Sequence, residues 1–250
     1  MPTALFLSPH LDDVAFSCGG TVAKLAAAGW RCVIATAFTR SVPNPTGFAL
    51  ACQLDKGLPA EADYMALRRG EDADAAAALG AEAVWLDFPE APHRGYSSAT
   101  DLFTGIAPGD DVRVKLADRL QEESLRLNPD AVFAPQGLGN HVDHLQLIRA
   151  VRAAALGPVP CWYRDTPYAI RDPQARPVDP LGAEPPFAVD IGGYLSFKLD
   201  ACAAYRTQVG FQFGGAAAMR AKLAVFATSE GCGEPAERFL GRVPDGVDAF

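Results

Sequence analysis

Short apolar runs alternate with longer amphipathic segments over the first 155 residues of the chain. The runs are continuous and rich in β-branched and aromatic residues, which is typical of strands buried on both faces of a parallel sheet. They predict strands at residues 3–8, 31–39, 83–88 and 131–134. The helical spacing of apolar positions that follows each run predicts helices at residues 14–28, 64–79, 110–127 and from residue 141 to about 155.

This alternation predicts an α/β fold. Repeated strand–helix units favour a Rossmann-like, doubly wound and mostly parallel sheet, because right-handed crossovers place helices on both of its faces. We expect the core strand order 3-2-1-4-5.

The pattern after residue 155 is less regular. It predicts strands at residues 161–169 and 187–191, and helices at residues 196–208 and 216–228. Segments rich in turn-forming residues predict loops at residues 41–63, 89–109 and 171–186. The first of these loops is expected to contain a short helix near residues 48–53. No change in composition marks a domain boundary, so we expect one domain over residues 1–250, with 1–155 as its Rossmann-like core and 156–250 completing it.

Composition and charge narrow the class of protein. The chain has 250 residues, of which 49% are hydrophobic and 21% charged, as in an ordinary globular domain. Its net charge is -8 and no large basic cluster occurs, which disfavours nucleic acid and anionic membranes as partners. No apolar stretch resembles a signal peptide or a membrane span, so the cytoplasm is the expected compartment. The sequence leaves the oligomeric state open, a homo-oligomer included.

The six cysteines are scattered and form no C-x-x-C pair. We expect buried thiols here, in preference to a disulfide framework or a cysteine-bound zinc.

Two polar motifs carry the candidate chemistry. His10-Leu11-Asp12-Asp13 follows the first predicted strand, and His141-Val142-Asp143-His144 follows the fourth. Strands 1 and 4 are neighbours in the predicted order, and their connections leave in opposite directions, so both motifs should meet at one crevice. Imidazole and carboxylate ligands suit a divalent metal with an open coordination position.

Each motif by itself has a structural explanation. The first could be a helix cap followed by acidic residues, and the second could be two exposed histidines. Their placement at the ends of adjacent strands favours a metal site. His10 and Asp13 share one side of a helical turn, which leaves Asp12 free to contact a metal-bound water. Asp143 could orient one of the imidazoles of its own motif.

The same sequence argues against nucleotide binding. The first predicted strand leads into the acidic motif and not into G-x-G-x-x-G, and the Gly19-Gly20 pair lies inside the next helix. Neither a Walker A sequence nor a G-x-S-x-G elbow occurs.

Together these residues resemble the PIG-L/LmbE-like family of zinc-dependent N-acetylglucosaminyl deacetylases. The family's His-Pro-Asp-Asp motif corresponds to residues 10–13, with Leu11 in place of proline, and its His-x-Asp-His motif corresponds to residues 141–144. Supporting matches cover nearly the whole chain and occur at Gly19-Gly20-Thr21, Arg68-x-x-Glu71, Ala78-Leu79-Gly80 and residues 198–208.

The resemblance implies a role for each motif residue. His10, Asp13 and His144 would bind one Zn²⁺ per chain, although such ligands also accept other first-row ions. Asp12 would be the general base, and His141 the general acid or oxyanion stabiliser. Asp143 would orient His141, raise its pKa and hold it cationic. Arg68 resembles a family arginine near the substrate. His93 and Arg94, in the 89–109 loop, are further candidates for substrate binding, and for His93 a structural role is the alternative.

The implied activity is metal-dependent removal of an N-acetyl group from an amino-sugar-containing small molecule. Two alternatives stay open: an amidase acting on a non-sugar acetamide, and a non-catalytic homologue that only binds a metal or ligand. The complete set of motif residues argues against the second alternative.

Overall fold

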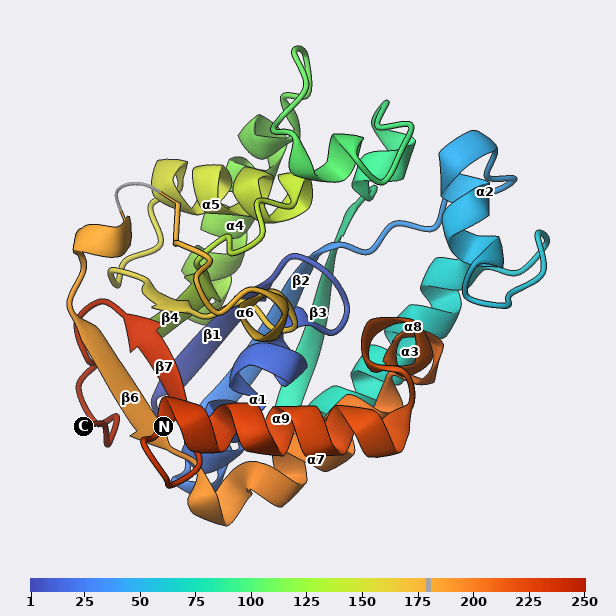
Figure 1. Ribbon diagram of the computed structural model, residues 1–250. Helices are drawn as coiled ribbons and strands as arrows, with labels where there is room; N and C mark the ends of the chain where they lie inside the picture. Colours follow the sequence, from blue (N-terminus) through green and yellow to red (C-terminus); the bar gives the residue numbers. More distant parts are fainter. Residues whose placement is uncertain (179–180) are drawn as a thin grey trace.

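The computed structural model describes residues 1–178 and 181–250, and within them one sheet organises the chain (Figure 1). Its strand order is β3-β2-β1-β4-β5-β7-β6. The strands are β1 (Thr3–Ser8), β2 (Arg31–Phe38), β3 (Ala81–Phe88), β4 (Ala131–Pro135), β5 (Cys161–Tyr163), β6 (Pro186–Asp190) and β7 (Ala236–Leu240).

The first five strands are parallel and confirm the predicted order 3-2-1-4-5. β1 is central: its Leu5 lies beside Val33 of β2 on one side and Val132 of β4 on the other. All three side chains are fully buried. This burial explains the continuous apolar runs in the sequence, because helices cover both faces of the sheet.

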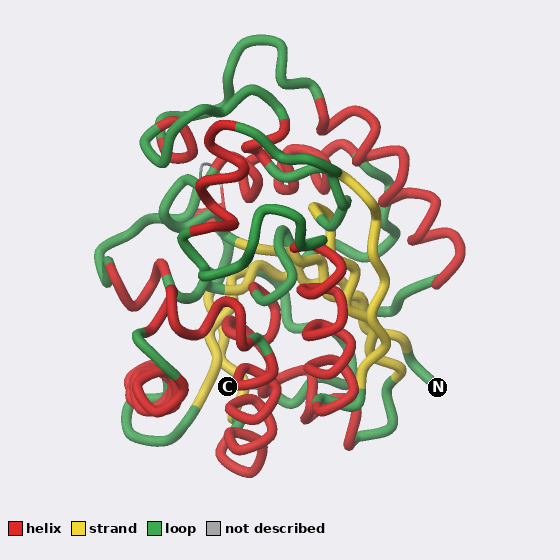
Figure 2. Tube along the Cα trace, turned by 90° about the vertical axis from the view of Figure 1, so that its right-hand side faces the viewer, coloured by secondary structure: helices red, strands yellow, loops and turns green. Residues whose placement is uncertain are grey.

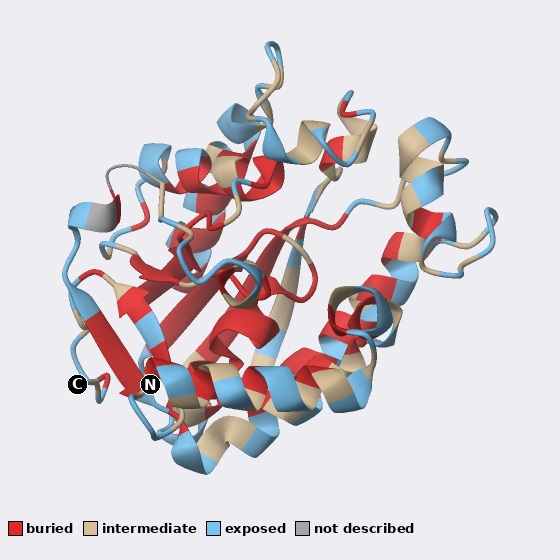
Figure 3. Cartoon of the chain, viewed as in Figure 1, coloured by how far each residue is buried: buried red, intermediate tan, exposed pale blue. Residues whose placement is uncertain are grey.

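The helices form a layer on each face (Figures 1 and 2). One layer contains α4 (Val112–Leu127) and α5 (Val142–Ala153), which pack on each other. The opposite layer contains α1 (Asp13–Ala27), α3 (Tyr64–Ala78), α7 (Leu195–Ala204), α8 (Arg206–Phe213) and α9 (Ala216–Glu230). Strands β1, β2, β4 and β5 are buried between the layers, whereas the edge strand β3 is mostly intermediate or exposed, as are the outer helix surfaces (Figure 3).

The C-terminal part differs from the prediction in two strands. The strand expected at residues 161–169 ends at Tyr163, and the chain continues to α6 (Tyr168–Arg171) after Pro167. β7 was not predicted; it lies antiparallel between β5 and β6. Its sequence contains Glu237, whose buried carboxylate pairs with Lys198 at 2.7 Å and accepts hydrogen bonds from the backbone N–H groups of Gly20 and Thr21, in the middle of α1. A buried charge that depends on distant partners gives no apolar strand pattern.

The helix expected at residues 196–208 is two helices, α7 and α8, separated at Tyr205. The tyrosine is 1% exposed and its hydroxyl donates to Asp72 of α3 at 2.8 Å. The buried hydrogen bond fixes a turn at Tyr205, where local helix propensity predicts that the helix continues.

The remaining short elements lie in the expected loops, except η4, which lies between β6 and α7. The helix predicted near residues 48–53 is α2 (Gly47–Leu54). The 3₁₀ turns are η1 (Ala91–His93), η2 (Asp101–Phe103), η3 (Leu181–Ala183) and η4 (Gly192–Tyr194). The loop predicted at residues 171–186 includes residues 179–180, which lie outside the described part of the chain.

All six cysteines are free, and those at 18, 32, 161 and 202 are buried as expected, whereas Cys52 is partly exposed and Cys232 is exposed. Of the helices in the described ranges, none is both long and apolar enough to cross a bilayer.

Candidate metal centre and active site

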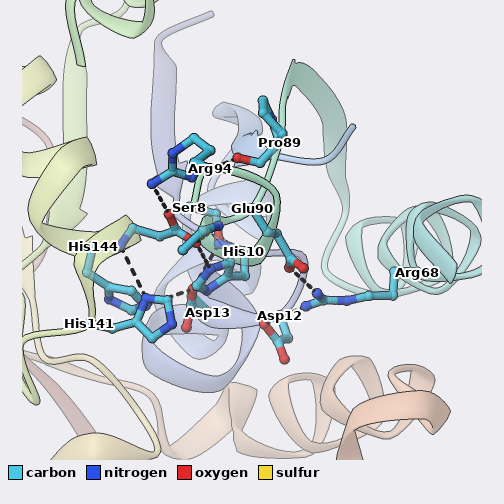
Figure 4. Close-up of polar contacts among 12 residues, drawn as sticks. Ser8, His10, Asp12, Asp13, Arg68, Pro89, Glu90, Arg94, His141 and His144 are labelled. Atoms are coloured by element: carbon cyan, nitrogen blue, oxygen red, sulfur yellow. Dashed lines mark hydrogen bonds and ion pairs between the residues drawn. The ribbon is translucent and has the colours of Figure 1, made fainter. Parts of the chain in front are cut away.

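The two polar motifs meet at the carboxyl ends of β1 and β4, as the strand order predicts. His10 and Asp13 lie at the start of α1, and His144 lies in the first turn of α5. Asp13 Oδ2 is 3.2 Å from His10 Nδ1 and 3.3 Å from His144 Nε2. Figure 4 shows the histidines of α5 on one side of this centre and Arg68 of α3 entering from the other.

Local backbone geometry sets these positions. The backbone N–H of His10 donates to Asp13 Oδ2 at 2.9 Å, which holds the carboxylate beside the imidazole. His141 is the N-cap of α5, and its Nδ1 accepts from the backbone N–H of Asp143 at 3.2 Å. His144 therefore points into the crevice from the first turn of α5.

The ligand set fits a divalent metal. One donor atom from each of His10, Asp13 and His144 lies within 4.8 Å of the others. His144 is fully buried, and its Nε2 makes no hydrogen bond although it faces the Asp13 carboxylate. Leaving such an atom unpaired is costly, and a bound cation would satisfy it. Two imidazoles and one carboxylate match the ligands of zinc sites that keep an open position.

Carboxylates behind the imidazoles fix which nitrogen each ring offers. His10 Nε2 donates to Asp143 Oδ2 at 2.9 Å, and His144 Nδ1 donates to Asp165 Oδ1 at 2.5 Å. The protons therefore lie away from the centre and leave His10 Nδ1 and His144 Nε2 as lone-pair donors. Asp165 was not among the predicted site residues, because the strand expected at residues 161–169 contained it; Asp165 follows the carboxyl end of β5.

The same carboxylates change the pKa of the ligands. Burial opposes charge on His144, but Asp13 and Asp165 raise its pKa to about 9. His10 behaves likewise, since Asp13 and Asp143 outweigh burial and raise its pKa. A metal ion would displace these protons, which couples metal binding to pH.

Asp143 does not orient His141 as predicted. Its Oδ2 accepts from His10 and from the backbone N–H of Ala91, while its Oδ1 is 2.8 Å from an Arg94 nitrogen. The N-cap geometry directs His141 Nδ1 to the backbone N–H of Asp143, and no hydrogen bond joins the ring to the Asp143 carboxylate among the described contacts. Asp143 does raise the pKa of His141 as expected, but burial and the charge of His10 outweigh it and lower that pKa to about 3. The ring is therefore neutral in this arrangement, contrary to the expectation of a cationic His141.

Asp12 lies beside the centre and outside the ligand set. Its Oδ1 is 3.4 Å from an Arg68 nitrogen, and a second nitrogen of Arg68 is 2.6 Å from Glu90. Burial raises the pKa of Asp12 to about 6 against the opposing charge of Arg68. A carboxylate with a pKa near neutrality is suited to accept a proton and to release it again.

Arg94 and His93 lie away from the centre's open side. Arg94 pairs with Asp110 and Asp143 and donates to the Pro89 carbonyl. It is thus a buried support behind Asp143 and does not line the cavity in front of the centre. His93, on η1, lines a separate recess of about 30 Å³. Both residues were predicted as candidates for substrate binding because the sequence shows only that they share a loop, and not where each side chain lies.

A cavity of about 330 Å³ opens in front of Asp12, Asp13 and His141. Its walls come from segments far apart in the chain: α2, α3, the 89–109 loop, α6 and α8. Aromatic rings form part of the walls, and they belong to Phe16, Phe48, Tyr64, Phe103, Tyr168 and Phe211. Such rings bury the apolar faces of a bound molecule, while the polar end at the centre orients it.

One wall depends on a glycine. Tyr168 packs edge-on against His144, with ring centroids 5.4 Å apart. Gly139, in the loop after β4, has φ +82°, and a Cβ there would lie 2.4 Å from the Tyr168 ring. The loop therefore combines a left-handed backbone with a close approach that glycine alone permits.

The fold and the His-Asp-His centre together define an α/β metal-dependent hydrolase. The sequence profile of the PIG-L family, described as GlcNAc-PI de-N-acetylase, matches residues 5–155. The chain belongs to this family of N-deacetylating hydrolases.

Similar proteins agree with that assignment. A 2'-N-acetylparomamine deacetylase of Streptomyces fradiae is 34% identical over 212 residues, which are 82% of this chain and 72% of the relative. The crystal structure of the A40926 pseudoaglycone deacetylase Dbv21 superposes with a TM-score of 0.83 at 24% identity over 98% of each chain. The zinc-inhibited form of teicoplanin deacetylase Orf2 gives 0.80 at 22% identity over 98% of this chain and 99% of its own. At these identities the two structures support the fold.

Proposed function

We propose that this protein uses one zinc ion per chain to remove the N-acetyl group from a small molecule that contains an amino sugar. The observation that carries the proposal is the unpaired His144 Nε2 facing Asp13, with the Asp12 carboxylate beside it and outside the ligand set. The similarity to an N-acetylparomamine deacetylase supports an amino-sugar substrate.

His10, Asp13 and His144 would hold the ion. When bound, zinc supplies Lewis acidity, which makes water more acidic and polarises an acetamide carbonyl. Asp143 and Asp165 hold the two imidazoles in the tautomers that bind metal.

Asp12 is the proposed base. It takes one proton from the attacking water, whose oxygen forms a bond to the acetamide carbon. The carbon–nitrogen bond then breaks, and Asp12 returns the proton to the departing amine. Acetic acid and a free amine are the products, and transfer of the acid's proton to the amine gives acetate and an ammonium group. The Asp12 pKa of about 6 suits both transfers near neutral pH.

His141 is the proposed stabiliser of the developing oxyanion. Because its Nδ1 accepts from the backbone of Asp143, a neutral ring carries its proton on Nε2. That N–H can donate to the oxyanion without a positive charge on the ring. This assignment agrees with the lowered pKa of His141 and selects one of the two roles that the sequence left open.

Arg68 would bind the substrate, since it reaches both Asp12 and Glu90 in the cavity wall. We assign Arg94 a positioning role through Asp143. A cytoplasmic location stays a prediction from the sequence.

The test combines metal analysis with acetate release. Purified protein should contain one equivalent of zinc, and it should release acetate from N-acetylglucosamine glycosides faster than from simple N-alkyl acetamides of similar size. Faster release from the simple amides would favour the amidase alternative. Stoichiometric metal without acetate release from either set would favour a binding protein.

A further inference from the structure

Lys56 occupies an unusual position in the outer part of the cavity. It follows α2, and its ammonium lies 5.3 Å from the ring centre of Tyr64 and 4.9 Å from that of Phe211. The ammonium donates to the Cys52 carbonyl at 2.9 Å. The two rings and this carbonyl hold the side chain in one place, half-buried in the cavity wall.

The ammonium retains unused hydrogen-bonding capacity. It has three N–H donors, and within residues 1–178 and 181–250 it makes no other hydrogen bond and no ion pair with a carboxylate. Glu90, a partly buried acid in that wall, is already paired with Arg68 at 2.6 Å. Burial and the charge of Arg68 lower the pKa of Lys56. A bound oxygen acceptor would use the free N–H donors, and an anionic acceptor would also stabilise the charge on the ammonium.

Lys56 lies farther from the metal centre than Arg68 along one wall. Arg68 contacts Asp12 at the inner end, and its guanidinium lies 5.4 Å from the same Tyr64 ring that Lys56 covers. A sugar whose acetamide reaches Asp12 would therefore pass Arg68 first. Lys56 would meet the group attached to that sugar.

We propose that Lys56 is a specificity-determining residue that donates to an oxygen acceptor, preferably a carboxylate or phosphate, on the group attached to the deacetylated sugar. This inference rests on the proposed function. A cationic amine at that place would face the ammonium of Lys56, a like charge in a partly enclosed cavity, whereas the charge of Arg68 is already balanced by Asp12 and Glu90. Asp55 also lines the rim, but its side chain is exposed and screened by water.

The test uses three N-acetylglucosamine glycosides that differ only at the end of a two-carbon aglycone, which carries a hydroxyl, a carboxylate or an amine. The wild-type protein should show the highest kcat/KM for the carboxylate and the lowest for the amine. One charge-assisted hydrogen bond predicts a difference of about tenfold between carboxylate and hydroxyl, expressed mainly in KM.

Lys56→Met keeps the length of the side chain between the two rings and removes its charge and donors. It should abolish the preference for the carboxylate, raise the KM of that substrate and leave kcat and zinc content unchanged. Lys115→Met is the matched control, because Lys115 is exposed on α4 and far from the cavity lining. Asp55→Asn should preserve the wild-type order.

Two results would overturn the role of Lys56: equal kcat/KM for all three glycosides in the wild type, or an unchanged preference in Lys56→Met. If Lys56→Met proves unfolded, the order of kcat/KM for the three glycosides in the wild-type protein still tests the proposal, because a preference for the amine contradicts it. Failure of all three glycosides to release acetate would instead refute the proposed function.

Discussion

The Nε2 atom of His10 donates a hydrogen bond to Oδ2 of Asp143 across 2.9 Å, and this bond joins the two polar motifs. It links residues separated by 133 positions in the chain. Because the proton is fixed on Nε2, Nδ1 is free to face Asp13. Arg94 and the backbone of Ala91 hold the carboxylate from behind. Asp143 thus supports His10, one of the proposed metal ligands, in place of the expected partnership with His141.

Asp143→Asn should weaken zinc binding. The amide cannot match the carboxylate as an acceptor for His10, and it leaves Arg94 with one partner fewer. Changes of this kind typically lower metal affinity by about 10- to 100-fold. Competition with a chelator measures the effect, and Asp118→Asn, at an exposed site on α4, serves as the control. An unchanged zinc affinity would show that the bond does not orient the ligand.

Asp12→Asn should retain zinc but lose most turnover. The side chain lies outside the ligand set, and an amide cannot accept the proton from water. General-base removal predicts a fall in kcat of about 10²- to 10⁴-fold. Metal analysis and acetate release on the same sample separate the two effects. Loss of zinc from this variant would make Asp12 a ligand, whereas near wild-type turnover would assign the base elsewhere.

The metal-free protein should lose stability as the pH rises from about 6.5 through about 9. The pKa of His144 is raised from 6.5 to about 9 in the folded state, so its stabilising charge is complete below 6.5 and is lost above 9. Thermal midpoints measured across this range in the presence of a chelator should fall. With zinc bound the proton is displaced, so the zinc-loaded protein should show a smaller decline. Equal pH dependence with and without zinc would contradict this origin.

Gly139→Ala should destabilise the protein more than Gly57→Ala. Both glycines have positive φ, +82° and +75°, but an added Cβ meets Tyr168 at 2.4 Å only at position 139. The backbone strain common to both variants is about 1–3 kcal/mol. The clash adds to that amount only at Gly139. Denaturant unfolding of the two variants isolates the contribution of the clash, and equal losses would show that α6 moves aside freely.

The same pair of glycines tests whether α6 supports the metal centre. A displaced Tyr168 would loosen its packing on His144. Gly139→Ala should therefore lower zinc affinity as well as stability, while Gly57→Ala should leave zinc affinity unchanged.

The sequence by itself determined the parallel core and the location of the site. Buried strands flanked by helices have little freedom in how they alternate, and polar residues at the carboxyl ends of β1 and β4 must share a crevice. The motif residues at 10–13 and 141–144 therefore identified the centre and the family. The contacts of Asp12, Asp13 and His144 agree with the roles predicted for them, and those roles remain to be tested by the variants above.

Only the tertiary structure decided which groups support and surround that centre. The partners of Asp143 and the arrival of Asp165 depend on the exact path of loops. A hydrogen bond between distant residues leaves no periodic signal in the chain. The same reason explains why β7, whose buried Glu237 is satisfied by Lys198 and α1, was missed. It also explains why the sequence did not predict the contact between Lys56 and Phe211, which are more than 150 positions apart and meet at the rim of one cavity.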